Sequence, residues 1–372
     1  MMLVAVALQS VGNLVFHGLA GRSMTPAAYG ALGAVLAAMV MIGVPLSGLQ
    51  VAASTTAAAQ GRLTAATARH ALRMSTLGAL PAALAVAVAA PAVRDWFHLA
   101  STGDALLLAP YLFVSVLLAV ARGLLLGSTG TFGALLLTLA GEVTALAVAL
   151  AACRSSVAAG PREGLGLRRV TRSTVALCGM FAFSSVDLLL ARHHLAGAPS
   201  GDYVAAATVA KTVLALPAAA MAVMLPRLVA AWALGRPGPA VRHALTLVAG
   251  TALVGGLVVA AVPGLVLRLL FGATYAGTGG LLRVLVVVAV LTAVVSTGVH
   301  SSLARGSTLT LVVPWLGAGL EVVLIELHHA SGAQIAGISV AAAVPTLLAV
   351  IAVEGVALAR AHRRLHRVLA DR

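Results

Sequence analysis

Long apolar runs separated by short polar turns dominate this chain. Stretches of about 18–25 mostly apolar residues recur along its whole length, and the connections between them are short. An α-helix needs a run of about this length to cross a bilayer. The pattern therefore predicts an all-α, polytopic membrane protein with about eleven transmembrane helices, near residues 1–20, 29–53, 72–93, 104–126, 131–153, 172–191, 203–231, 243–267, 280–303, 308–327 and 332–358.

The composition agrees with this pattern, because 61% of the 372 residues are hydrophobic and only 9% are charged. A soluble domain usually carries about 25% charged residues. The bilayer is therefore expected to be the main solvent, with membrane lipids as partners. The net charge of +14 comes from arginines that lie between the apolar runs, which is the positive-inside pattern rather than a nucleic-acid surface.

The arginines also predict the orientation in the membrane. The loop with Arg62, Arg69 and Arg73 and the basic tail with Arg360 and Arg363 are both expected in the cytoplasm. This predicts a plasma-membrane protein with a cytoplasmic C-terminus, and the use of arginine with almost no lysine favours a bacterial source. Counting crossings back from the tail places the segment 154–172 inside, whereas counting forward from the second loop places it outside. Either the first half lacks one helix, or one segment there does not cross as drawn.

Two stretches about 172–176 residues apart resemble each other. Both read Leu-Ala-Gly, a short polar turn, a tyrosine, and then a long helix with a proline in its middle. A duplicated bundle with a site between its halves is a common transporter plan. The matching pairs are Gly21 with Gly197, Tyr29 with Tyr203, and Pro45 with Pro217.

The repeat and the charges together predict the domain organisation. Residues 1–153 are expected to form an N-terminal bundle of five spans, and 154–171 a basic cytoplasmic linker. Residues 172–360 are expected to form a C-terminal bundle of six spans, followed by a basic cytoplasmic tail over 361–372. The mid-helix prolines Pro45, Pro217 and Pro226 are candidate hinges, because a transporter helix can bend at proline without exposing its backbone to lipid.

Three stretches resemble one known family. They are "DLLLARHHLAGAPSGDYVAAATVAKTVLALPAAAMAVMLPRLVAA" in the second half, "GRSMTPAAYGAL" with "PLSGLQVAAS" in the first, and "LRLLFGATYAGTGGLLRVL" before the tenth helix of the family. Their order and spacing resemble the polysaccharide-biosynthesis (O-antigen-type) flippases of the multidrug, oligosaccharidyl-lipid and polysaccharide exporter superfamily. The resemblance implies a fold of twelve helices, six per half, and the flipping of lipid-linked oligosaccharides by alternating access.

The chain departs from the pattern of that family in two places. A sixth helix would follow Cys153, but the sequence continues directly into the basic linker, so the sixth helix of the twelve-helix fold is predicted to be missing. Relatives often carry an arginine shortly after the position of Gln50, where this chain reads Ser54, Thr55, Thr56.

Asp187 is the best placed of the acidic residues, because it lies within a predicted span. A charge at the centre of a membrane helix costs about 2.5–3.5 kcal/mol, so such residues usually find partners or line a wet cavity. Asp187 and Lys211, on the next helix, are expected at similar depths, which allows a pair across the hairpin. The pair either lines a substrate or ion cavity or locks two helices together. The resemblance implies an acidic position at Asp187 and a basic one at Arg227.

Further polar residues lie within predicted spans. Gln9, Asn13 and His17 are spaced four apart, so they form one stripe that faces either a cavity or a neighbouring helix. Gln50 and Glu142 are candidate cavity residues of the first half. Arg227 is either a phosphate contact or a plain topology anchor.

No arrangement typical of an enzyme, a cofactor site or a metal site is present in the sequence. We therefore expect a transporter that flips a lipid-linked oligosaccharide or polysaccharide precursor, with a coupling cation, H+ or Na+, as a further candidate partner. The alternatives are an ion-coupled small-molecule or drug exporter of the same superfamily, and a degenerate member that no longer transports.

Overall fold

The computed structural model describes residues 2–59, 65–129, 167–195, 197–307 and 309–370. Within these ranges the chain forms helices and turns and no strand, which confirms the predicted all-α fold. The helices are α1 (Met2–Ser23), α2 (Pro26–Ala59), α3 (Ala65–Trp96), α4 (Thr102–Leu106), α5 (Leu108–Thr129), α8 (Leu167–His194), α9 (Ala198–Thr212), α10 (Ala215–Ala233), α11 (Gly238–Ala261), α12 (Pro263–Phe271), the 3-10 helix η1 (Ala273–Thr278), α13 (Gly279–Arg305), α14 (Leu309–Leu327) and α15 (Gly332–Ala370).

The apolar runs correspond closely to the long helices. Eleven helices in the described ranges have at least 15 residues, in agreement with the expected number of about eleven. Eight described segments are long and apolar enough to cross a membrane, and one of them contains both α9 and α10. The predicted fifth span, 131–153, and the point where a sixth helix would follow it lie outside the described residues.

Three predicted helices differ in detail from the structure. The helix expected over 203–231 is interrupted at Val213–Leu214, just before Pro217, and its first part begins already at Ala198. The helix expected over 243–267 ends at Ala261, because Pro263 starts the separate helix α12. The helix α8 begins at Leu167, so the end of the expected linker is helical.

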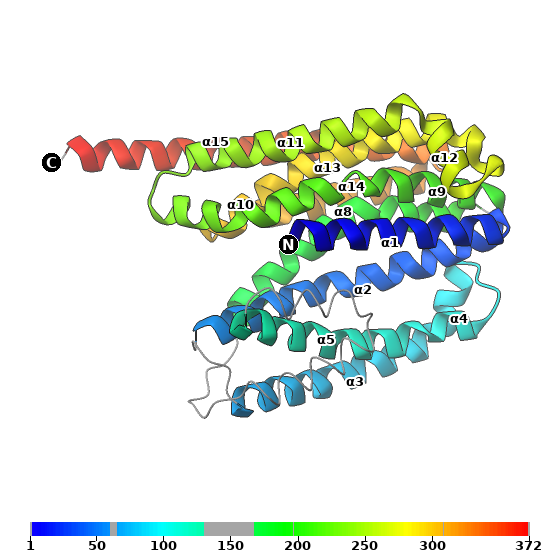
Figure 1. Ribbon diagram of the computed structural model, residues 1–372, viewed down its shortest axis with the longest axis horizontal. Helices are drawn as coiled ribbons and strands as arrows, with labels where there is room; N and C mark the ends of the chain where they lie inside the picture. Colours follow the sequence, from blue (N-terminus) through cyan, green and yellow to red (C-terminus); the bar gives the residue numbers. More distant parts are fainter. Residues whose placement is uncertain (1, 60–64, 130–166, 196, 308, 371–372) are drawn as a thin grey trace. The chain divides into compact units, whose positions relative to one another are not determined.

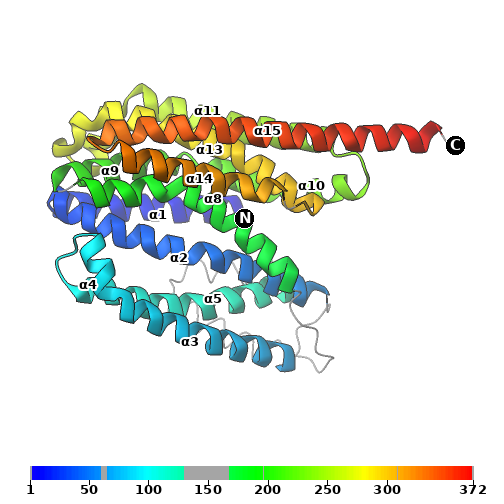
Figure 2. The ribbon, with the colours of Figure 1, turned by 180° about the vertical axis from the view of Figure 1, so that it is seen from behind.

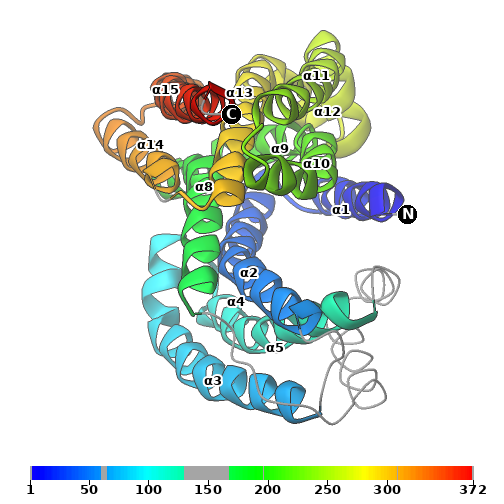
Figure 3. The ribbon, with the colours of Figure 1, turned by 90° about the vertical axis from the view of Figure 1, so that its left-hand side faces the viewer.

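By its internal contacts the chain divides into two compact units. The first comprises Met1–Ala5 and Ala34–Cys178, and the second comprises Val6–Gly33 and Gly179–Arg372. In the first unit α3 and α5 run side by side, and α4 joins them at one end (Figure 2). In the second unit α13 is central and contacts α9, α10, α11, α14 and α15 (Figures 1 and 3). The expected domain boundaries stay a prediction.

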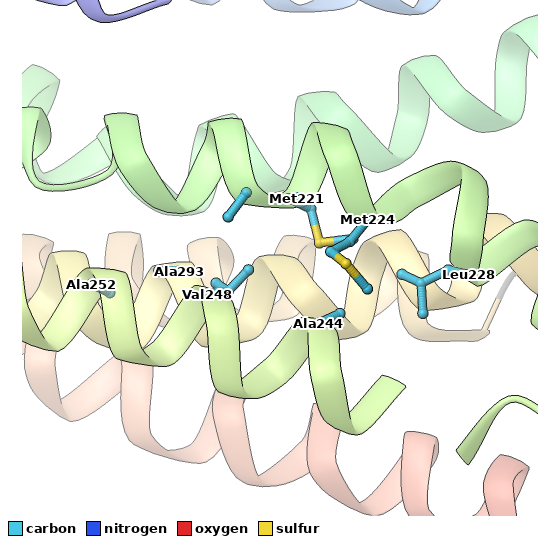
Figure 4. Packing of buried hydrophobic residues seen from close by; sticks show 8 residues of the cluster. Met221, Met224, Leu228, Ala244, Val248, Ala252 and Ala293 are labelled. Carbon is cyan, nitrogen blue, oxygen red and sulfur yellow. The ribbon is translucent and has the colours of Figure 1, made fainter. Parts of the chain in front are cut away.

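Small side chains allow the helices of the second unit to pack closely. Ala244, Val248 and Ala252 are spaced four apart on α11 and are all buried. They meet Met221 and Met224 of α10 (Figure 4). Residues three and four apart share one helix face, so this packing follows directly from the sequence periodicity. Close approach through small residues is a usual source of stability between membrane helices.

Within the second unit, the C-terminal turn of α1 binds the end of α12. The Arg22 guanidinium donates to the backbone carbonyl of Leu270 at 3.1 Å and to that of Leu269. These are carbonyls at the C-terminal end of α12, where a cation is favourable. Gly18 permits the approach, because a Cβ there would lie 2.9 Å from the Leu270 oxygen.

Candidate functional site

Asp187 lies in a buried polar cluster of the second unit. Its helix, α8, lies beside α14 (Figures 2 and 3). Asp187 is only 4% exposed. Oδ2 accepts a hydrogen bond from the Tyr203 hydroxyl of α9 at 2.8 Å. Tyr203 is itself fully buried. The negative charge of Asp187, which is costly within an apolar helix, is therefore stabilised by a hydrogen bond from the phenol of Tyr203 on the next helix.

Lys211 lies in the same region, but its hydrogen-bond partner is not the Asp187 carboxylate that the sequence suggests. Its ammonium donates to the Ser185 hydroxyl at 3.2 Å, and it interacts with Asp187 through space. The reason is the start of α9 at Ala198, which places Lys211 thirteen residues past the turn, whereas Asp187 lies seven before the end of α8. At ~1.5 Å per residue their backbones differ in depth by roughly 9 Å, which the long lysine side chain partly spans.

Glu321 of α14 is a second buried carboxylate in this cluster, with an exposure of 2%. It interacts electrostatically with both Asp187 and Lys211. The Ser339 hydroxyl of α15 donates to the Ile335 carbonyl at 3.2 Å and interacts with both Glu321 and Tyr203. Four helices, α8, α9, α14 and α15, thus contribute polar groups to one buried network.

A small cavity of about 20 Å³ adjoins this network. Asp187, Lys211 and Ser184 line it together with Thr292 of α13. Among the described residues, Asp187 Oδ1 and the Thr292 hydroxyl are buried without a hydrogen-bond partner. A polar cavity of this size is large enough for about one water molecule. The cavity therefore places two unsatisfied oxygen atoms where a water or a small cation fits.

The charges of the cluster define what it can do. Asp187 and Glu321 with Lys211 carry a net charge of −1 when all three are ionised. Buried like charges repel, so taking up a proton or another cation relieves the cluster. An arrangement of this kind can couple cation binding to helix position, because its members come from different helices. It can equally act as a fixed polar lock between the helices.

His17 belongs to a second cluster, which is aromatic. Its Nδ1 lies 2.9 Å from the Tyr29 hydroxyl, and Tyr29 packs against Phe271 and Tyr275. Asn13 is exposed, and the side chain of Gln9 lies outside the described residues. His17 therefore faces a neighbouring helix, which is one of the two positions expected for the stripe.

The remaining predicted positions are dispersed. Gln50 is half-buried in α2 within the first unit, and Glu142 lies outside the described residues. Arg227 is exposed on α10 and has its nearest described hydrogen-bond partner in Met224 Sδ, at 3.8 Å. Pro45 lies inside the continuous helix α2, whereas Pro217 follows the break between α9 and α10. Pro226 lies within α10.

Several residues of the cluster are not apparent from the sequence. Tyr203 stands out there as a repeat marker, paired with Tyr29, but its bond to Asp187 is a tertiary contact. Ser185, Thr292 and Ser339 are small polar residues in apolar helices, which are common and carry no pattern. Both repeat tyrosines are fully buried, and both contact a polar side chain of the preceding helix. In the sequence, the matching repeat positions of Tyr29 and Tyr203 are the one signal that singles out Tyr203, and they do not name its partner.

Solved structures with a similar fold include MATE family transporters and a lipid II flippase. The inward-facing structure of a multidrug resistance MATE family transporter is 16% identical, with 99% of this chain and 96% of that chain covered and a TM-score of 0.65. The lipid II flippase MurJ, in an inward closed conformation, is 9% identical, with 94% and 86% covered and a TM-score of 0.69. A transporter from Pyrococcus furiosus is 17% identical, with 98% and 94% covered and a TM-score of 0.60.

No protein-family profile and no curated protein matches the sequence. At these identities the structural likeness defines the fold. The chain thus has the fold of transporters of the MOP superfamily, to which the MATE and MurJ structures belong, and it is a multi-pass membrane protein.

Proposed function

We propose that this protein flips a lipid-linked oligosaccharide or polysaccharide precursor across the bacterial plasma membrane by alternating access. The observation that carries the proposal is the buried network of Asp187, Tyr203 and Glu321 in a chain with a MOP transporter fold. The three O-antigen-flippase-like stretches and the lipid II flippase among the structural neighbours support a lipid-linked substrate. The C-terminus and its arginines lie in the cytoplasm in this proposal.

We further propose that H+ or Na+ couples to transport at the Asp187 cluster. The net negative charge of the cluster and the unsatisfied Asp187 oxygen beside a small cavity support a cation there. Because the cation Lys211 also lines the cavity, a proton on a carboxylate requires less rearrangement than a metal cation. Transport in vesicles driven separately by a pH gradient and by a Na+ gradient would identify the coupling ion.

The first test is translocation of a fluorescent polyprenyl-pyrophosphate oligosaccharide in proteoliposomes. We expect transport by the natural protein and a decrease of at least about tenfold in Asp187→Asn, because the amide keeps the shape but loses the charge. The matched control is Asp95→Asn, which changes an exposed aspartate of the first unit and should leave the rate unchanged. Equal rates in proteoliposomes and empty liposomes would overturn the proposal.

Export of a small molecule is the alternative function, and the MATE multidrug transporters among the structural neighbours favour it. Uptake of an organic cation into the same proteoliposomes, with no movement of the glycolipid, would establish it. In cells, deletion of the gene should accumulate the lipid-linked intermediate on the cytoplasmic face if the glycan function holds. A chain that moves neither class of substrate would be a member that no longer transports.

A further inference from the structure

A large pocket opens between α10, α13 and α15 in the second unit. Its volume is about 950 Å³, and it shares no lining residue with the cavity at Asp187. Trp232 of α10, Arg305 at the end of α13, and Arg360 near the end of α15 contribute its polar walls. The pocket thus lies where α10 and α13 end and α15 continues to Ala370, beyond the apolar middle of their spans.

The cationic wall of this pocket is held in place by neighbouring side chains. Arg305 forms an ion pair with buried Glu354 and lies over the Trp232 ring, with 5.3 Å from its Cζ to the ring centroid. The Ser302 hydroxyl donates to Glu354 at 2.7 Å, and the Trp232 indole donates to Ser301 at 3.2 Å. An ordered guanidinium loses little freedom when it binds an anion.

The charge around the pocket is predominantly positive. Arg360 lines it, and exposed Arg236 follows the lining residue Gly235 on the turn after α10. With Arg305 this gives three cations, and the carboxylate of Glu354 pairs with one of them, Arg305. The pocket therefore has an excess of positive charge that suits a phosphate group.

The other walls of the pocket are apolar and continue onto the outer surface. Val229, Leu234 and Val356 line it and are 47%, 76% and 49% exposed. Val229 lies on α10, Leu234 directly after α10, and Val356 on α15. Both helices belong to candidate membrane spans. A molecule with an alkyl chain can therefore enter from the side of the bilayer while its head group meets the arginines.

We propose that this pocket binds one anionic phospholipid, with its phosphate at Arg305 and Arg360 and its acyl chains along Val229, Val353 and Val356. Basic pockets between transmembrane helices are a known way to hold anionic lipid head groups. The volume and the apolar walls fit a lipid far better than free phosphate, which would fill a small part of the space. This lipid is a resident partner, so the inference holds whichever substrate the protein carries.

Trp232 provides a direct probe of this site. In a full-length Trp96→Phe, Trp315→Phe background it is the remaining tryptophan of the three in the chain. Phosphatidylglycerol with brominated acyl chains, titrated in mixed micelles, should quench its fluorescence at lower lipid fractions than brominated phosphatidylethanolamine. Arg360→Gln should weaken the phosphatidylglycerol effect about tenfold, because it removes a charge-assisted contact with the phosphate. The matched control, Arg268→Gln, removes another exposed arginine, on α12, and should change nothing.

A second variant tests the apolar part of the pocket. Ala357→Phe places a ring into the space that the acyl chains occupy, so it should weaken quenching by phosphatidylglycerol without removing a charge. Equal quenching by both lipids, or equal behaviour of Arg360→Gln and Arg268→Gln, would overturn the proposal. Displacement of the brominated lipid by millimolar inorganic phosphate would also overturn it, because it would indicate a site for soluble anions.

Discussion

The Tyr203 phenol satisfies one oxygen of a carboxylate whose other oxygen, Oδ1, has no hydrogen-bond partner among the described residues. Removing the phenol hydroxyl would leave a buried charge with neither oxygen bonded. A buried acceptor that loses its donor costs about 1–3 kcal/mol, and more when it is charged. Tyr203 therefore carries more of the stability of this cluster than its neutral side chain suggests.

We expect Tyr203→Phe to destabilise the protein by about 2 kcal/mol or more, measured as a lower thermal unfolding midpoint in detergent. Tyr275→Phe is the matched control. Tyr275 is 1% exposed, and its hydroxyl has no hydrogen-bond partner among the described residues, so its loss should be neutral or slightly stabilising. Equal decreases for the two variants would contradict this account of Asp187.

The same bond predicts that the effects at Tyr203 and Asp187 are not additive. Asp187→Asn in the natural protein loses a charge-assisted hydrogen bond, whereas in Tyr203→Phe that bond is already absent. The second substitution should therefore cost less in the double variant than alone, with a coupling of about 1 kcal/mol or more. Additive midpoints would indicate that the two side chains act independently.

At the scale of helices, glycines set how closely α2 and α9 approach within the second unit. A Cβ at Gly201 would overlap the carbonyl oxygen of Pro26, and one at Gly33 would overlap Val204. A Cβ at Gly30 would meet Ser200. The two helices that begin the repeated stretches thus cross backbone to backbone, as small residues allow in membrane proteins.

We expect Gly201→Ala to destabilise the protein by about 1–3 kcal/mol, because the added methyl group must displace backbone rather than a flexible side chain. Gly250→Ala is the control, since Gly250 lies inside α11 and a Cβ added there would meet nothing within 4 Å. Alanine there should stabilise by up to about 1 kcal/mol through helix propensity. A neutral Gly201→Ala would mean that the two helices separate easily.

The helices themselves were largely predictable from the sequence, but their contacts were not. Apolar runs predicted the existence of the spans, since each span must satisfy its own backbone and present apolar side chains to lipid. Pro217 marked the region where α9 ends and α10 begins. The Arg22 contacts with Leu269 and Leu270 join residues about 250 positions apart, and no periodicity encodes such a pairing. For the same reason Asp187 was predictable as a site residue, whereas Tyr203 as its partner was not.

At the scale of the whole molecule, we expect six spans in the second half, as the resemblance to the twelve-helix fold implies. The helix α8, the pair α9–α10, the pair α11–α12 and the helices α13, α14 and α15 correspond to the six predicted spans of that half. In this arrangement each turn would lie on the opposite side of the membrane from the turn before it. The basic turns and the tail, with Arg236, Arg305 and Arg360, would then fall on one side, which the positive-inside rule predicts to be the cytoplasm.

This alternation gives a test that separates the two faces. After replacement of the native cysteines, Ala198→Cys and Arg236→Cys place one thiol at each end of the α9–α10 span, at positions that are both exposed. In intact cells a membrane-impermeant maleimide should label Ala198→Cys and leave Arg236→Cys unlabelled. In inside-out vesicles the labelling should reverse. Because these two sites flank a single span, labelling of both from one side would contradict the six-span second half. Labelling of Arg236→Cys alone in intact cells would place the basic tail and the phospholipid pocket on the outer face.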